Sequence, residues 1–154
     1  AGFKSSFLEL LGIPGTIIAG FLADKTFKGK SLSVIIIYLI LMCGCIFSIY
    51  LIPPGHGVLD AICFGASGFF IYGIQMISTG LAPLEMVPRK AVASAVGLTG
   101  AMSYLGAVLT SSLTGFITDH YGWGGAFTFW IVCGIAAIVI TLILLSTRPK
   151  SVAV

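Results

Sequence analysis

Five long apolar runs, separated by short polar segments, most constrain what this chain can fold into. They cover residues 5–23, 32–52, 59–84, 91–117 and 125–146. Each is close to the about 20 residues that an α-helix needs to cross a bilayer. The runs are too long for strands and lack their period-two alternation. Because 58% of the residues are hydrophobic and only 8% are charged, we predict an all-α integral membrane protein with five transmembrane helices.

The basic residues predict how these helices cross the membrane. If the loops alternate between the two sides, one side collects seven of the eight basic residues: Lys25, Lys28, Lys30, Arg89, Lys90, Arg148 and Lys150. The other side has only Lys4. Because lysine and arginine accumulate in cytoplasmic loops, we expect the chain to start outside and to end in the cytoplasm. The chain opens without methionine, a few residues before the first run, so we interpret it as a fragment.

Gly20 and Asp24 lie one helical turn apart where the first run ends, and Lys25 follows directly. Arg89 and Lys90 come just before the fourth run, at the expected start of a helix whose N-terminus carries a partial positive charge. We expect Asp24 to contact that start, so that Gly20, Asp24, Lys25 and Arg89 form a conformational latch. The alternative is a solvated aspartate beside a lysine cluster.

Two of the runs differ from the others in their residue composition. Small residues recur every fourth position along the fourth run, at Ala95, Thr99, Ser103, Ala107, Ser111 and Gly115. Such a ridge permits close approach of a partner helix, and we expect the first helix to approach it at Gly20. The second run is almost uniformly aliphatic, so we expect a peripheral, lipid-facing helix.

Four polar side chains within the runs are candidates for a binding site: Glu9, Tyr72, Gln75 and Tyr104. Within a bilayer, a carboxylate, a phenol or an amide needs polar partners or a water-filled cavity. Tyr72 and Gln75 stand three apart, on one face of a helix. Hydrogen bonds that serve only the structure are the alternative for Glu9, Tyr72 and Gln75. A purely structural, lipid-facing subunit would need none of the four.

The sequence lacks the patterns typical of enzymes and metal centres, since it has no nucleophile elbow, no phosphate-binding loop and no metal-ligand spacing. The four cysteines lie in apolar runs and are interpreted as packing residues. Lysine and arginine clusters at membrane edges are better explained by the lipid bilayer than by nucleic acid. We therefore expect no catalysis, no cofactor, no metal and no nucleic-acid partner.

The stretch GIPGTIIAGFLADKTFKGK, residues 12–30, resembles the major facilitator superfamily. In that superfamily the loop between helices 2 and 3, echoed between 8 and 9, reads roughly G-x-x-x-D-R/K-x-G-R/K. GIPGT before the loop and DK-x-F-K-G within it are similar to the organophosphate:phosphate antiporters. The stretches F-x-YG-x-QM around Tyr72, VPRKAV and GLTGAMSYLGA extend this resemblance over nearly the whole chain.

The resemblance implies that residues 1–154 are a partial C-terminal transmembrane domain, helices 8 to 12 of a twelve-helix bundle. It implies a secondary active transporter of the inner (plasma) membrane. Such an antiporter exchanges a phosphorylated metabolite, such as glycerol-3-phosphate or a hexose phosphate, for inorganic phosphate by alternating access. The N-terminal half and helix 7, which carry phosphate-binding arginines in the family, would then be partners of this chain. Glu9, Tyr72 and Tyr104 match positions that line the cavity. The alternative is a related membrane sensor of external sugar phosphate.

The chain departs from the family pattern at three points. Ile74 replaces a proline after Tyr72-Gly73, and the segment from Tyr72 to Arg89 is one residue longer. An Asp/Lys pair that some hexose phosphate transporters carry on helix 11 is missing. This last departure favours glycerol phosphate or a similar small ester as the substrate.

Overall fold

The computed structural model describes residues 2–26, 31–52 and 57–147, and within them every regular element is a helix. Helix α1 (Gly2–Phe21) continues into a π-helix, η1 (Leu22–Thr26), and α2 (Ser31–Leu51) follows. Helix α3 (Gly57–Met76) continues through a second π-helix, η2 (Ile77–Leu81), into α4 (Ala82–Met86). A short 3-10 helix, η3 (Arg89–Ala91), precedes α5 (Val92–Thr147).

Four helical stretches are long and apolar enough to cross a membrane: Ser6–Lys25, Ser31–Leu51, Gly57–Met86 and Arg89–Thr147. The all-α class that the sequence predicts is therefore confirmed. The count differs from five because the fourth and fifth predicted helices are joined into one element, α5. The described residues place no loop between them, only a sharp kink.

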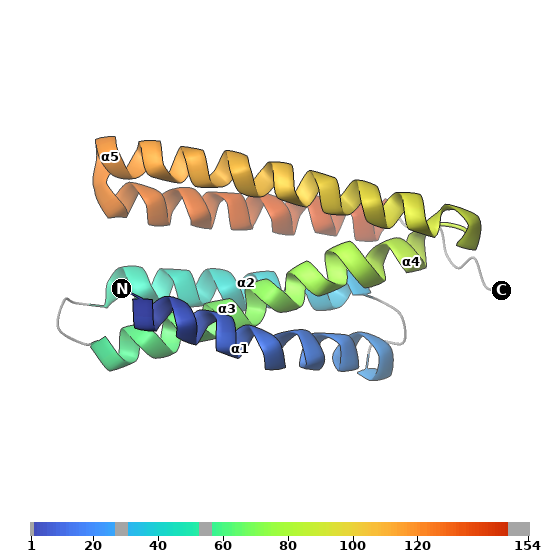
Figure 1. The fold of residues 1–154 in the computed structure, drawn as a ribbon, viewed down its shortest axis with the longest axis horizontal. Helices are drawn as coiled ribbons and strands as arrows, with labels where there is room; N and C mark the ends of the chain where they lie inside the picture. The colour runs from blue at the N-terminus through green and yellow to red at the C-terminus, as the bar shows by residue number, and fades with distance from the viewer. Residues whose placement is uncertain (1, 27–30, 53–56, 148–154) are drawn as a thin grey trace.

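Helix α5 is a hairpin of two arms, and Gly122 is the point at which it turns. Gly122 has φ 71° and ψ −176°, a conformation that is open essentially to glycine alone. The arms before and after it lie side by side, from yellow to red in Figure 1. Across the arms, the indole N–H of Trp130 donates a hydrogen bond of 3.0 Å to the hydroxyl of Thr114. The sequence predicts a loop over residues 118–124. In the structure only Gly122 of this segment leaves the helical conformation, and the chain reverses direction there.

Helices α1 and α3 cross at close range because both present glycine at the contact. A Cβ atom on Gly68 would lie 2.5 Å from the carbonyl oxygen of Leu8, and one on Gly15 would overlap the carbonyl oxygen of Phe69. Glycine permits such an approach of two backbones, and any larger residue would separate the helices. The small residues of the predicted third helix therefore serve its packing against the first.

Part of the surface of helix α2 is buried, which the prediction of a peripheral helix did not include, while Ile37, Ile40 and Phe47 are exposed, as expected of a lipid-facing helix. One face of α2 packs against α3 and another against the α5 hairpin. Its buried residues are Ser31, Leu32, Val34, Ile35, Tyr38, Leu39 and Ile46. The ring of Tyr38 occupies space that Gly73 leaves free, and it meets Phe70 edge to face at 5.3 Å. A helix that is apolar all round carries no periodic signal of which face is buried, so the sequence could not identify this role.

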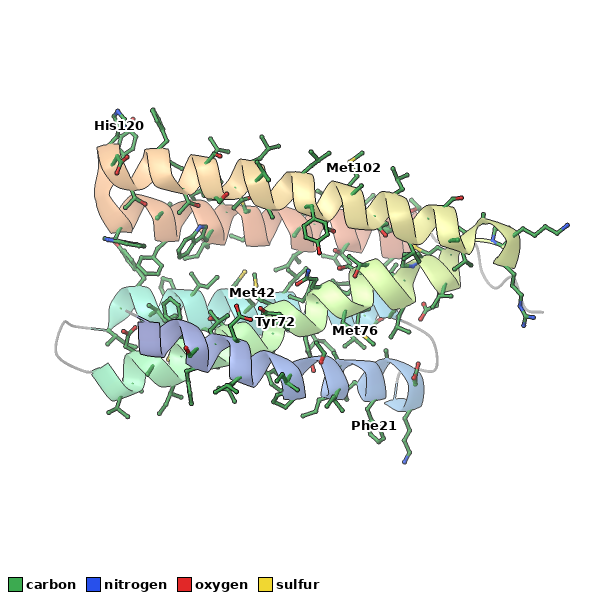
Figure 2. All side chains as sticks on the ribbon, in the orientation of Figure 1. Phe21, Met42, Tyr72, Met76, Met102 and His120 are labelled. Atoms are coloured by element: carbon green, nitrogen blue, oxygen red, sulfur yellow. The ribbon has the colours of Figure 1, made fainter. Side chains whose placement is uncertain are left out.

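The ends of the helices gather at two opposite ends of the bundle (Figure 1). One end holds η1, the start of α2, α4, η3 and the start of α5. We call it the η3 end. The other holds the start of α3 and the Gly122 turn. Figure 2 labels one side chain near each, Phe21 at the η3 end and His120 at the turn. This alternation is what five consecutive membrane crossings require.

Candidate functional site

Glu9 of α1 and Tyr72 of α3 meet across the glycine-lined crossing. The hydroxyl of Tyr72 donates a hydrogen bond to the carboxylate of Glu9. Gly12 makes this possible, because a Cβ atom there would lie 2.5 Å from Cδ2 of Tyr72. The tyrosine ring therefore rests directly on the backbone of α1, one turn from Glu9. The two residues that the sequence analysis assigned to one site are thus in direct contact.

A shallow pocket of about 340 Å³ opens beside this pair. It is lined by Glu9, Leu10, Gly12, Ile13, Thr16 and Tyr72. The hydroxyl of Thr16 is already engaged, since it donates a 2.7 Å hydrogen bond to the carbonyl of Ile13. The carboxylate and the phenol are then the groups that can recognise a ligand. Because the single O–H of Tyr72 is donated to Glu9, the pair suits a ligand with hydroxyl groups, which can donate to the carboxylate and to the phenol oxygen.

Gln75 and Tyr104 do not join the pair in the described part of the chain. Tyr104 lies on the first arm of α5 and is 74% exposed, and Gln75 on α3 is also exposed. Within residues 2–26, 31–52 and 57–147, neither side chain is hydrogen-bonded to Glu9 or Tyr72. Their part in a binding site stays a prediction.

The proposed latch residues lie at the η3 end, and no hydrogen bond or ion pair joins their side chains within the described part of the chain. Asp24 is exposed in η1 and makes no hydrogen bond or ion pair with any residue that the structure describes. Lys25 lies over the ring of Phe21, with Nζ 5.0 Å from the ring centroid. Arg89 is exposed in η3. The latch stays a prediction about another conformation, and Lys28 and Lys30 lie outside the described residues.

Gly20 does not approach the ridge of small residues in this structure, so that contact stays a prediction together with the latch. A Cβ atom on Gly20 would meet Cε of Met76 on α3 at 3.4 Å. Helices α1 and α5 form no substantial contact within the described residues. Most of the ridge of small residues on α5 is exposed, namely Ser103, Ala107, Ser111 and Gly115. Small residues indicate that a helix can be approached closely, but they do not identify the partner.

The strongest polar contact at the η3 end is one that the sequence analysis missed. The carboxylate of Glu85 accepts a 2.9 Å hydrogen bond from the hydroxyl of Ser31 and 3.3 Å bonds from its backbone N–H. Ser31 is fully buried and begins α2. The first N–H groups of a helix lack intrahelical partners and favour a negative charge, so Glu85 caps α2 from another helix. A serine at a helix start was the one signal in the sequence.

The π-helix η2 lies between Tyr72 and Arg89, the segment in which the resemblance implies one extra residue. A π-turn closes its hydrogen bonds over five residues rather than four, so it absorbs an extra residue without breaking the helix. The hydroxyls of Ser78 and Thr79 each donate a 2.7 Å hydrogen bond, to the carbonyls of Ile74 and Gln75 respectively. These bonds satisfy backbone oxygens around the wider turn.

The described residues contain no cluster of three or more histidine, cysteine, aspartate or glutamate side chains that could hold a metal ion. All four cysteines are free. Cys43 of α2 packs against Gly134 on the second arm of α5, where a Cβ atom would overlap its sulfur. That contact fits the interpretation of Cys43 as a packing residue.

Comparison with curated proteins finds relatives over most of this chain. The glycerol-3-phosphate transporter of Bacillus subtilis is 33% identical over 144 residues, which cover 93% of the chain and 32% of that protein. The membrane sensor protein UhpC of Escherichia coli is 34% identical over 140 residues, 91% of the chain and 31% of the sensor. The phosphoglycerate transporter protein of Salmonella typhimurium is 39% identical over 123 residues, 79% of the chain and 26% of that transporter.

The chain therefore spans about a third or less of the length of the relatives that it matches. No family model matches it. Two of these relatives are transporters and one is a membrane sensor by name, and the described helices are apolar enough to cross a bilayer several times. Together these findings identify a multi-pass membrane protein.

Proposed function

Because the chain is homologous, over most of its length, to the organophosphate transporters of the major facilitator superfamily, we propose that it is part of a secondary active transporter. The transporter exchanges a phosphorylated metabolite for inorganic phosphate by alternating access. Residues 1–154 form part of its C-terminal transmembrane domain. The substrate is a small phosphate ester such as glycerol-3-phosphate, or a hexose phosphate.

The hydrogen-bonded pair of Glu9 and Tyr72 is the observation that carries this proposal. A carboxylate and a phenol facing a pocket of about 340 Å³ suit the hydroxyl groups of a polyol or sugar. They do not suit its phosphate, because two negative groups at close range repel each other. In the substrate complex we therefore place the hydroxyl-bearing part of the ester beside Glu9 and Tyr72.

The phosphate group then needs cations that the pocket beside Glu9 lacks. The basic residues Lys25, Arg89 and Lys90 all lie at the η3 end rather than in the pocket. We propose that the phosphate is bound by the N-terminal half and helix 7 of the complete protein. This division makes both halves necessary for binding, as alternating access requires.

The same homology supports a second candidate function, because one relative is a membrane sensor. A sensor would bind its ligand on the outer side without moving it. The complete protein, reconstituted into liposomes loaded with labelled phosphate, distinguishes the two. Release of the label on adding external glycerol-3-phosphate or a hexose phosphate supports the antiporter. Binding of either ester without release would support the sensor, and neither binding nor release with both esters would overturn both proposals.

We propose further that the protein lies in the inner membrane with the η3 end in the cytoplasm. The basic residues Lys25, Arg89 and Lys90 support this orientation, since they all lie at that end. The opposite end holds His120 and the Gly122 turn, with Asp119 beside them.

A further inference from the structure

Tyr38 of α2 fills a slot between α1 and α3 in the core of the bundle. A Cβ atom on Gly73 of α3 would overlap the Tyr38 ring and would lie 3.1 Å from the Cβ atom of Ala19 in α1. Two further rings of α3, Phe69 and Phe70, flank Tyr38 with ring centroids at 6.0 and 5.3 Å. Only 3% of Tyr38 is exposed. The slot therefore holds the ring on several sides and shields it from water and lipid.

The hydroxyl group of Tyr38 has no hydrogen-bond partner among residues 2–26, 31–52 and 57–147, although it is fully enclosed. Such a hydroxyl has lost its hydration without compensation, so it destabilises the conformation that holds it. A phenylalanine would fill the same slot without this cost. Further helices of the complete protein cannot reach the hydroxyl as long as α1, α2 and α3 enclose it. A partner for this hydroxyl therefore requires a movement of α1 or α3 relative to α2.

The π-helix η2, which begins four positions after Gly73, can supply both the movement and the acceptor. Its hydrogen bonds span five residues, as in the bond from the N–H of Ala82 to the carbonyl of Ile77. A return to α-helical bonding would shift the register by one residue and turn one side of the helix by about 100° relative to the other. The backbone carbonyls just before η2 already accept hydrogen bonds from hydroxyls, those of Ser78 and Thr79. The stretch beside Tyr38 thus has two possible registers and carbonyls that bind hydroxyl groups.

We propose that Tyr38 is a hydrogen-bonding residue of a second conformation of the protein. In that conformation α3 is displaced on α2, and the Tyr38 hydroxyl donates to a backbone carbonyl of residues 73–78. The ring stays in the same core, which also contains Ile77 of η2, and only the pairing of the hydroxyl changes. The unpaired hydroxyl destabilises the present conformation and so brings the two closer to equal free energy. The inference rests on the proposed alternating access, which requires a second conformation.

Tyr38→Phe in the complete protein tests this inference, with Tyr50→Phe as the matched control. Tyr50 also packs on an aromatic ring, that of Phe127 at 6.2 Å, but it is 52% exposed, so its hydroxyl needs no partner within the protein. Tyr38→Phe should raise the melting temperature, because it removes the unpaired hydroxyl. It should also lower the population of the second conformation at least about fivefold, because that conformation loses a hydrogen bond. Tyr50→Phe should change neither.

The methyl group of Met76 reports the populations of the two conformations. Met76 follows Gly73 by three positions on α3, and its Cε atom would lie 3.4 Å from a Cβ atom on Gly20 of α1 (Figure 2). Its methyl NMR signal therefore depends on how α1 and α3 are placed. In wild-type protein with isotope-labelled methionine methyl groups we expect two Met76 signals, which Met76→Leu assigns. One of the two should lose intensity in Tyr38→Phe.

Three results would overturn the inference. A lower or unchanged melting temperature in Tyr38→Phe would mean that the hydroxyl is not unpaired in the present conformation. A higher melting temperature with an unchanged ratio of the two signals would mean that it is unpaired in both. A single Met76 signal in the wild type, with and without phosphate, would exclude the second conformation. These results do not depend on phosphate release, so a failure of the proposed function is recognised separately, by the liposome assay on the wild type.

Discussion

The carboxylate of Glu85 in α4 caps the start of α2 by accepting hydrogen bonds from the hydroxyl and the backbone N–H of Ser31, 54 positions earlier in the chain. The contact joins the end of the α3–α4 stretch to the start of α2. Ser31 is fully buried there, so water cannot replace the carboxylate. The position of α2 therefore depends on a residue of a different helix.

A double-mutant cycle measures this contact. Glu85→Gln and Ser31→Ala should each lower the free energy of unfolding by about 1–2 kcal/mol, because each leaves part of a buried helix start unsatisfied. The double variant should lose less than the sum, since both changes remove the same interaction. Denaturant unfolding in detergent gives all four values. Strict additivity would contradict a direct contact between the two residues.

The glycine-lined crossing of α1 and α3 makes a second prediction. Gly15→Ala should lower stability by about 1–3 kcal/mol, because its Cβ would overlap the carbonyl of Phe69 and push the helices apart. Gly44→Ala, where a Cβ meets nothing within 4 Å, is the matched control on α2. It should be neutral or stabilising by up to about 1 kcal/mol. Melting temperatures in detergent compare the two, and equal effects would contradict the close crossing.

Most of the long helices of this fold could be predicted from the sequence, because a single property, the length of each apolar run, identifies them. The length of an apolar run fixes a membrane helix, so the five runs located all the long helices. The conformation of Gly122 could not be predicted, because the glycines and polar residues around it are equally compatible with a loop. The burial of α2 was missed since an evenly aliphatic helix has no distinct face. The Glu85–Ser31 contact was missed because no sequence pattern relates residues so far apart.

The candidate site was found for a different reason. Glu9 and Tyr72 were singled out as polar groups in apolar runs, which are costly in a bilayer and need partners. That reasoning does not predict that the two residues contact each other. Only the resemblance implies that both line one cavity. The contact itself depends on Gly12, whose missing side chain admits the tyrosine ring. Gln75 and Tyr104 are polar residues in apolar runs as well, yet within the described residues neither side chain is hydrogen-bonded to the Glu9–Tyr72 pair. Polarity in an apolar run therefore does not predict which residues lie together.

Removing the hydroxyl of Tyr72 tests its part in binding. Tyr72→Phe loses the hydrogen bond to Glu9 and should weaken substrate binding by about 1 kcal/mol, roughly a fivefold rise in Kd. Tyr50→Phe is the matched control, because Tyr50 packs on Phe127 in α5, away from the pocket. Isothermal titration of the complete protein with glycerol-3-phosphate measures both. An unchanged Kd in Tyr72→Phe would leave the Glu9–Tyr72 bond a purely structural one.

The orientation of the bundle makes a fourth prediction. Cysteines placed at Lys25 and Arg89, in a protein whose native cysteines are replaced by serine, should react with an impermeant maleimide only from the cytoplasm. A cysteine at His120 should react only from outside, because the Phe21 and His120 ends are opposite (Figure 2). The reason is the accumulation of basic residues on the cytoplasmic side. Labelling of Lys25 and His120 positions from the same side would contradict the five crossings.

The last prediction concerns Asp24 in a second conformation of the protein. In this structure Asp24 is exposed and unpaired among the described residues, so Asp24→Asn should leave the melting temperature nearly unchanged. If Asp24 contacts the start of α5 in a second state, the variant loses about 0.3–1 kcal/mol of attraction to the helix N-terminus in that state alone.

Such a loss shifts the balance between two nearly equal conformations about two- to fivefold, and with it the rate of phosphate exchange. Asp119→Asn, exposed at the opposite end, is the matched control and should exchange at the normal rate. A cysteine pair at Asp24 and Ala91 should cross-link only under conditions that favour the second state. Because the latch requires both a kinetic effect and proximity, exchange at the normal rate in Asp24→Asn, or no cross-link in any state, would eliminate it.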